Sequence, residues 1–153
     1  LHSLKNNDIK FSSSVFPSFR PLVYNNFWSP KSPFKYDNDL IEIPISCTQT
    51  FRIINSLSYF KLLGPNNLIN ILDNCLLPDL IIFDSHLHDF FPDVNQIEKL
   101  PFFLSKLYMH NVNEGLTIFE LFITYLLNKG YKFITMSELL NSLAINDLED
   151  VKI

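Results

Sequence analysis

The sequence predicts a single α/β domain with parallel strands, and three observations support that prediction. Short apolar runs typical of strands alternate along the chain with segments of helical period. Polar and titratable residues gather directly after one of these apolar runs. The chain has 153 residues, whereas a closed (β/α)8 barrel needs about 250. We therefore expect parallel strands that make up only part of a barrel.

Three short segments are predicted strands. In Leu40 to Ser46 the apolar residues alternate, which is typical of a half-buried strand. Leu80 to Phe83 is a continuous apolar run, as in parallel strands that are buried on both faces. Tyr131 to Ile134 is predicted to be a third strand.

Helical periodicity fills the segments between these strands. Apolar residues recur at helical spacing in segments 51–63, 66–76, 116–128 and 136–143, and more weakly between 92 and 111. Gly64 and Gly130 follow two of the segments, at positions typical of a helix end. Thr135 and Glu138 have the spacing of a capping box, which predicts the start of the last helix.

The chain divides into three parts by its patterning. Residues 1–39 are predicted to be a long loop region, because residues 11–36 are rich in Ser, Pro, Asn and aromatic residues without a regular period. Residues 40–145 carry the pattern of an α/β core, and residues 146–153 form a tail. Long loops inside compact domains usually serve a function.

Composition and charge exclude several classes of protein. With 47% hydrophobic and 18% charged residues, the chain is expected to bury a core rather than to be disordered. The net charge of −4 and the scattered Lys and Arg residues argue against a nucleic-acid partner. The longest apolar helix candidate is interrupted by Glu120 and falls short of the roughly 20 apolar residues that a membrane span takes. Cys47 and Cys75 have no C-x-x-C spacing, so neither a zinc site nor a disulfide scaffold is indicated.

The first residues have neither an initiator methionine nor the pattern of a signal peptide. The first residue is Leu1, and the first ten residues lack the charged start and apolar run of a signal peptide. We therefore expect a fragment of a longer protein, and a cytoplasmic location is favoured.

The concentrated group of titratable residues directly follows Leu80 to Phe83. It comprises Asp84, His86, His88 and Asp89. In parallel α/β folds the carboxyl ends of strands carry catalytic residues, because the loops there converge on a crevice. A histidine at this point could transfer a proton to a leaving group, since its unperturbed pKa lies near neutrality. The alternative is that both histidines only bind loop backbone.

The segment from Tyr24 to Pro30 interleaves aromatic and amide side chains. This composition suits a surface that stacks on sugar rings while amides bind hydroxyl groups. Trp28 and Tyr24 are therefore candidate substrate-binding residues, and Arg20 could hold an anion or a loop carbonyl. The alternative is that Phe27 and Trp28 are hydrophobic plugs that pin the loop. Cys47 could be considered a nucleophile, but no neighbour in the sequence marks it as activated.

One resemblance concerns the titratable group alone. The string from Ile82 to Asp89 resembles the D-x-H-x-H signature of metal-dependent hydrolases of the amidohydrolase, TatD-type nuclease and polymerase-histidinol-phosphatase groups. This resemblance implies that His86 and His88 bind a metal ion. Those families need further ligands downstream, yet His110 is the only histidine that follows in this chain.

A second resemblance covers nearly the whole chain. Four stretches in collinear order are similar to the C-terminal half of polysaccharide deacetylases, the NodB-like carbohydrate esterase family four: Lys10 to Pro17, Leu40 to Ser46, Phe83 to Phe90, and Gly130 to Leu139. The resemblance implies a distorted (β/α) barrel that removes N-acetyl or O-acetyl groups from sugar polymers. Related members cut other non-peptide C–N bonds.

The resemblance also implies a division of chemical roles. A divalent metal such as zinc polarises the acyl carbonyl and activates water, an aspartate serves as base, and a late histidine protonates the departing amine. His86 corresponds to that histidine, with His88 as the alternative, and Asp89 or Asp84 would orient the imidazole.

The family's other motifs lie upstream of the matched region. Its metal-binding aspartate pair, its H-x-x-x-H motif and its Arg-containing substrate motif do not occur in this sequence. We therefore expect no metal in this chain, no activity of the chain alone, and a missing N-terminal half that completes the enzyme. The substrate would be an acetylated polysaccharide or oligosaccharide. The alternative is a non-catalytic carbohydrate-binding or structural remnant.

Overall fold

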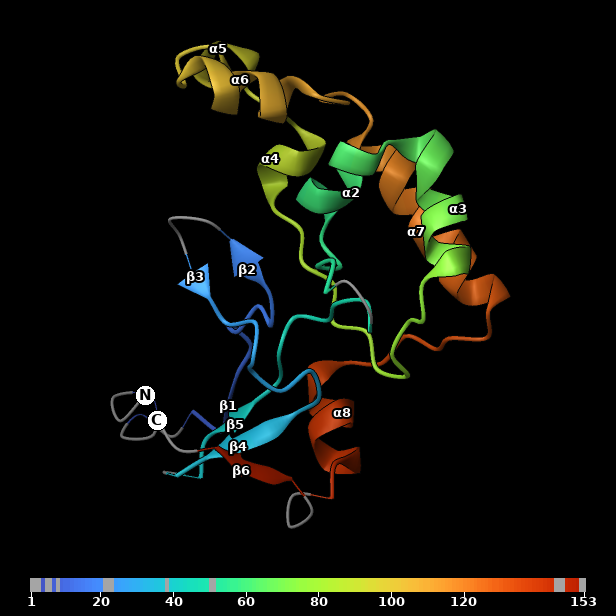
Figure 1. Ribbon diagram of the computed structural model, residues 1–153. Helices are drawn as coiled ribbons and strands as arrows, with labels where there is room; N and C mark the ends of the chain where they lie inside the picture. The colour runs from blue at the N-terminus through green and yellow to red at the C-terminus, as the bar shows by residue number, and fades with distance from the viewer. Residues whose placement is uncertain are drawn as a thin grey trace.

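A computed structural model describes residues 4, 7, 9–20, 24–37, 39–49, 52–144 and 148–151. Within these residues the chain is a mixed α/β fold with two small sheets and seven helices (Figure 1). The larger sheet lies with the last helix at one end of the molecule, and the other helices gather at the opposite end (Figure 1). None of the helices in this described part is long and apolar enough to span a bilayer.

The larger sheet has four short strands in the order β1-β5-β4-β6. Its strands are β1 (Phe11–Ser12), β4 (Phe34–Tyr36), β5 (Ile41–Glu42) and β6 (Glu149–Val151). The β1–β5 and β4–β6 pairings are parallel, and the central β4–β5 pairing is antiparallel. Strands β2 (Phe19–Arg20) and β3 (Tyr24–Asn25) form a separate antiparallel pair. Parallel pairing thus occurs at both edges of an open, mixed sheet, and no barrel closes among the described residues. Of the predicted strands, Leu40 to Ser46 alone contributes to this sheet, through β5.

Most of these strands lie where the sequence did not predict them. Strands β1 to β4 fall in the region expected to be loop, and β6 falls in the expected tail. Each strand has only two or three residues, which is too short to produce an alternating pattern. Conversely, residues 131–134 form no strand. Residues 80–84 are not part of a sheet either: they form one isolated bridge, between Ser56 and Asp84, and hydrogen bonds to the main chain and hydroxyl of Ser46.

The helices agree better with the sequence pattern. They are α2 (Leu57–Leu63), α3 (Pro65–Asn74), α4 (Leu87–Phe90), α5 (Val94–Ile97), α6 (Phe102–Met109), α7 (Gly115–Asn128) and α8 (Met136–Ser142). The predicted capping box of α8 is confirmed, because Thr135 Oγ1 accepts from Glu138 N and the Glu138 carboxylate accepts from Thr135 N. Helix α2 begins later than predicted, since the Ser56 hydroxyl caps it at Tyr59 N. Phe51, the predicted start, lies outside the described residues.

Helices α2, α3 and α7 enclose the main apolar core. Its buried members are Leu57, Phe60, Leu68, Leu72, Ile118, Phe122 and Leu126. Phe83 packs its ring against Phe60 and Phe122, at centroid distances of 5.6 and 4.9 Å. On the sheet side, Leu139 of α8 packs on Ile41 and Ile43. The helical core therefore anchors the 80–84 segment just before the titratable residues.

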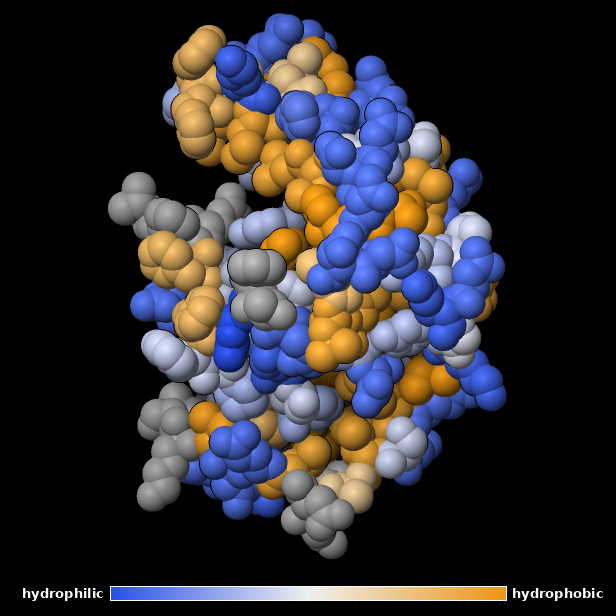
Figure 2. Space-filling model, turned by 45° about the vertical axis from the view of Figure 1, so that its right-hand side comes forward, coloured by the Kyte–Doolittle hydropathy of each residue, from blue (hydrophilic) through white to orange (hydrophobic). Residues whose placement is uncertain are grey.

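Exposed apolar residues gather on the projecting lobe that carries α5 and α6, where orange and tan atoms lie among blue ones in Figure 2. Its exposed apolar residues are Leu100, Phe102, Phe103, Leu104 and Leu107. Helix α6 has no buried residue, so this lobe adds little to the core.

Candidate functional site

The predicted titratable group lies at the turn from the 80–84 segment into α4. Asp84 N donates to the main-chain oxygen of Asn55 at 3.1 Å, and Leu57 N donates to the main-chain oxygen of Asp84 at 2.9 Å. These two bonds fix the segment against residues 55–57, directly before α2 begins. His86 then occupies the N-cap position of α4. The residues at the start of α2 therefore hold the turn in place.

Asp89 is the buried anchor of this turn. It is 3% exposed, and its carboxylate accepts from the main-chain N–H of His86 at 3.0 Å and from the Ser58 hydroxyl at 2.7 Å. A buried carboxylate needs such donors, because removing an unpaired charge from water is costly. The pair of contacts fixes the main chain of His86 relative to α2.

Two further residues close around the main-chain oxygen of Asp89. Lys61 Nζ donates to that oxygen at 3.3 Å. Burial lowers the pKa of Lys61, and the nearby Asp89 carboxylate acts in the opposite direction. Gly115, the first residue of α7, approaches the same oxygen so closely that a Cβ would overlap it. The turn is thus packed between α2 and α7.

The two imidazoles point to the surface. His86 and His88 are exposed, and their rings stack with centroids 5.1 Å apart and planes 13° from parallel. Asp84 Oδ2 lies 3.6 Å from His86 Nε2, within the range of an ion pair with the protonated ring. The Asp84 carboxylate and the rings of His86 and His88 therefore lie next to one another. Asp89 was expected to orient the imidazole as well, but it binds the main chain, and Asp84 is the carboxylate beside the ring.

The stacking bears on the D-x-H-x-H interpretation. A ring nitrogen binds a metal ion along its lone pair, which lies in the plane of the ring. Because the His86 and His88 planes are nearly parallel and separated, their lone pairs do not converge on one point. Across the part of the chain that the structure describes, no group of three or more His, Cys, Asp or Glu side chains could hold a metal ion.

The aromatic segment forms a turn that follows β3. Trp28 is 87% exposed, so the alternative that it is a buried plug is wrong. Tyr24 is half-buried and stacks on Phe16 at 5.9 Å, which commits its ring to packing. The side chain of Arg20 lies outside the described part of the chain. Trp28 is therefore the one predicted substrate-binding side chain that is seen to face solvent.

Cys47 is not placed as a nucleophile. It is buried, and its Sγ donates to the main-chain oxygen of Pro17 at 3.7 Å. Burial raises the pKa of the Cys47 thiol, although Arg52 and Lys31 act in the opposite direction. The thiol is therefore protonated and unreactive at neutral pH.

Sequence reasoning missed Ser58, Lys61 and Gly115. Ser58 and Lys61 lie three residues apart on α2, so they share a face of that helix. A lysine inside the apolar run Phe60 to Leu63 was a usable signal of a buried cation. Gly115 gave no such signal, because its contact with Asp89 joins segments far apart in the sequence.

Comparison with known proteins adds no further constraint. No protein-family model matches the chain, and no curated protein or solved structure matches it.

Proposed function

We propose that this chain is the C-terminal part of a metal-dependent deacetylase of acetylated polysaccharides, in which His86 is the general acid. The observation that supports the proposal is the pairing of the exposed His86 imidazole with the Asp84 carboxylate at 3.6 Å, where the 80–84 segment ends. A general acid needs access to the substrate and a fixed position. His86 has both, because its ring is exposed and its main chain is bound by Asp89.

In this proposal each residue of the turn has a separate task. The Asp84 carboxylate orients the imidazole, which in its protonated form donates its proton to the nitrogen of the departing amine. Asp89 and Ser58 keep the His86 main chain in place through their buried hydrogen bond. His88 stacks on the His86 ring and is the alternative acid.

The remaining parts of the enzyme would come from upstream of Leu1. A divalent metal such as zinc, held by an N-terminal half, would supply the polarised acyl carbonyl and the activated water. The parallel β1–β5 and β4–β6 pairings of the open sheet support a place in a larger, distorted (β/α) barrel, whereas its central β4–β5 pairing is antiparallel, unlike the strands of a regular barrel. The substrate would be an acetylated glycan, and the bond cut would be its amide or ester to acetate.

Acetate release tests this proposal, measured on the longer protein of which this chain would be the C-terminal part, here called the parent protein. We expect the parent, with its upstream sequence, to release acetate from an N-acetylated oligosaccharide. The His86→Gln variant should lose about 100- to 10,000-fold in kcat, whereas His88→Gln should stay near wild type. Loss should be smaller for a substrate with a better leaving group, because protonation then matters less. A parent without acetate release, or a His86→Gln variant as active as His88→Gln, would overturn the proposal.

The sequence upstream of Leu1 provides an independent test. The proposal requires an aspartate pair and an H-x-x-x-H motif there, because the described residues hold no metal-binding group. An upstream region without either motif would remove the catalytic role.

A further inference from the structure

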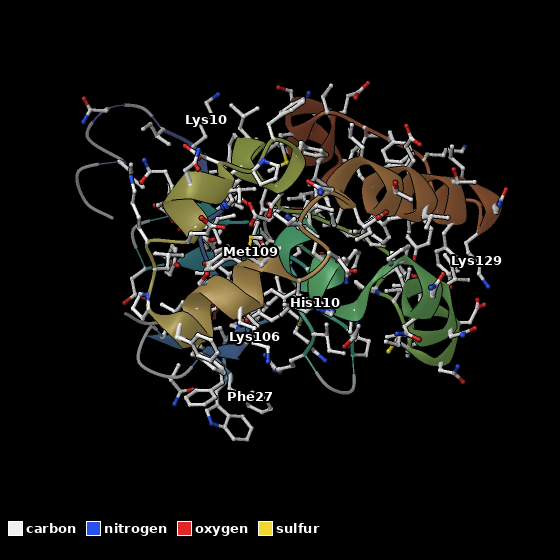
Figure 3. All side chains as sticks on the ribbon, turned by 90° about the horizontal axis from the view of Figure 1, so that it is seen from above. Lys10, Phe27, Lys106, Met109, His110 and Lys129 are labelled. Carbon is white, nitrogen blue, oxygen red and sulfur yellow. The ribbon has the colours of Figure 1, made fainter. Side chains whose placement is uncertain are left out.

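The lobe that carries α5 and α6 projects at the end of the molecule opposite the larger sheet (Figure 1). Figure 3 views this end from above, with Lys106 and Met109 of α6 labelled. Apart from Ser105 and Lys106, the residues of α6 are apolar or aromatic, yet none of its described residues is buried. A helix that is apolar on all sides is normally enclosed by protein or by lipid. Helix α6 has no such covering in the described part of the chain.

The exposed apolar side chains extend around more than half of α6. Phe102 is 84% exposed, Phe103 74% and Leu104 37%. Successive residues of an α-helix are turned by about 100°, so these three cover an arc of about 200°. A protein partner that docks on one side would leave part of this arc in water. A lipid interface surrounds a projecting tip on every side and would cover the whole arc.

Basic residues accompany this apolar arc. Residues 99–113 contain two lysines but no Asp or Glu, although the chain has a net charge of −4. The acidic residue that comes just before them, Glu98, is the C-cap of α5. Lys106 is exposed and lies three residues after Phe103 and four after Phe102, so it shares a side of α6 with both rings. Its long stem can reach headgroup phosphates while the rings are inserted.

A protein ligand fits this surface less well than a bilayer does. A second copy would bring like faces together in a two-fold dimer, which places two Lys106 ammonium groups against each other. Peptide ligands are usually bound in grooves. Two cavities seen in the described part of the chain lie away from the lobe, one at Lys31 and Gln49 and the other beside Ile69 and Thr117.

The base of the lobe is fixed to the helical core. Asn111 lies shortly after α6, and its Nδ2 donates to the main-chain oxygen of Lys61 at 2.6 Å. Its φ of 50° lies in the left-handed region, which asparagine tolerates better than most residues. Gly115 then begins α7 directly against the main-chain oxygen of Asp89. Because these contacts hold the base, little further ordering is needed when the tip meets a surface.

We propose that this lobe binds the surface of a bilayer that contains anionic lipids, and that it inserts the Phe102 and Phe103 side chains at the boundary between headgroups and acyl chains. Lys99 and Lys106 contact the headgroup phosphates, each adding about fivefold to the affinity. Insertion of a few side chains gives reversible binding and spans nothing. This inference does not depend on the role of His86.

Co-sedimentation of the 153-residue chain with lipid vesicles tests the proposal. We expect vesicles of equal parts phosphatidylcholine and phosphatidylglycerol to bind the chain at least tenfold more tightly than vesicles of phosphatidylcholine alone. Added salt should reduce this difference, because it screens the lysines from the headgroups. A chain that sediments with neither vesicle, or equally with both, would overturn the proposal.

Matched variants locate the binding surface. The double variant Phe102→Ala/Phe103→Ala should bind the anionic vesicles at least tenfold more weakly, and Lys106→Gln about fivefold more weakly. Phe133→Ala and Lys132→Gln are the controls, because Phe133 is 59% exposed beside an exposed lysine but lies outside the lobe. Both controls should bind as the wild type does. Equal weakening by the lobe variants and the controls would contradict the proposal.

A fluorescent reporter measures insertion separately from electrostatic attraction. Trp28 is the only tryptophan in the sequence, so Trp28→Phe combined with Phe103→Trp places the sole indole on α6. We expect its emission to move to shorter wavelength on the anionic vesicles and to be quenched by lipids with brominated acyl chains. An emission that the vesicles leave unchanged would rule out insertion and overturn the proposal.

Sedimentation velocity without lipid tests whether a second copy covers α6 instead. We expect a monomer, or a dimer that Phe102→Ala/Phe103→Ala leaves intact, since either result leaves α6 free for lipid. A dimer that this double variant dissociates would show that α6 is an interface between copies, and would overturn the lipid proposal.

Discussion

The helical core and the His86 turn are built from opposite kinds of contact. In the core, Phe60 and Phe122 are fully buried and meet edge to face at 4.8 Å, with apolar neighbours on α3. In the turn, Asp89 is equally buried but is held by a hydroxyl, a main-chain N–H and an ammonium near its carbonyl. The core adds many weak dispersion contacts, whereas the turn depends on a few directional ones.

Helix α2 belongs to both regions, and this shows how the site is positioned. Phe60 faces the apolar core, while Ser58 and Lys61 face the turn. Since the core fixes the helix, it also fixes the two polar groups that hold Asp89. Loss of a core contact should therefore act on global stability, and loss of a turn contact should act mainly on the geometry around His86.

Phe122→Ala should produce the largest effect and is the direct test of the core. Deleting a fully buried phenylalanine removes its transfer free energy and leaves a cavity, which costs about 3–5 kcal/mol. Urea denaturation followed by far-ultraviolet circular dichroism measures the loss. Phe102→Ala, at an exposed position, should change the free energy of unfolding by less than about 0.5 kcal/mol. Equal effects of the two substitutions would mean that the core is not where stability resides.

Gly115→Ala tests the contact between the turn and α7. The new Cβ would overlap the main-chain oxygen of Asp89, which cannot rotate away as a side chain could, so we expect a loss of about 3 kcal/mol. Helix propensity alone predicts the opposite sign, because alanine is the better helix former. Gly130→Ala is the matched control. It has a φ of 86° with no neighbouring atom within 4 Å, and should cost only the backbone strain of about 1 kcal/mol.

The same contrast explains what the sequence could predict. The core was visible because its residues repeat at helical spacing, as in Ile118, Phe122 and Leu126 on α7. The capping box at Thr135 and Glu138 was also visible, because a cap is a local feature of three to four residues. The cluster of histidines and aspartates was visible because its members stand close together in the sequence.

The contacts that hold the site could not be predicted in this way. Ser58 and Asp89 are 31 positions apart, and the buried Glu42 binds the main-chain N–H of Ser14 across 28 positions. No local period connects such pairs. The positions of the strands were not predicted for a related reason. Strands of two or three residues pair because of their neighbours in space and not because of a pattern in their own sequence. The structure was therefore needed to show which aspartate lies beside the His86 ring.

Asp89→Asn should lower the free energy of unfolding by about 2 kcal/mol, which is less than the loss expected for Gly115→Ala. The amide keeps the shape of the carboxylate but offers one acceptor oxygen in place of two, so either the Ser58 hydroxyl or the His86 N–H loses its partner. Ser58→Ala, which removes one of these bonds, should cost about 1 kcal/mol. Denaturant unfolding gives both values. An Asp89→Asn protein as stable as wild type would show that the buried carboxylate does not hold the turn.

The smallest expected effect concerns the pH dependence that Lys61 gives to stability. Burial lowers the pKa of Lys61 in the folded protein below its ordinary value of 10.5, against the opposing charge of Asp89. Between the folded pKa and 10.5 the unfolded chain therefore binds more protons than the folded one. The linkage relation then requires the contribution of Lys61 to the free energy of unfolding to rise with pH across that window.

Lys61→Met isolates this contribution, because methionine keeps an unbranched apolar stem and does not titrate. The free energy of unfolding of the wild type, relative to the variant, should rise between neutral pH and pH 10.5. Burial raises the pKa of Cys47 and of Tyr36, which lowers stability as pH rises, but both groups are present in both proteins and cancel in the difference. If the difference in free energy of unfolding between wild type and Lys61→Met stayed constant over this range, the Lys61 ammonium would not be desolvated. The polar contacts around Asp89 would then be as open to water as contacts on the surface.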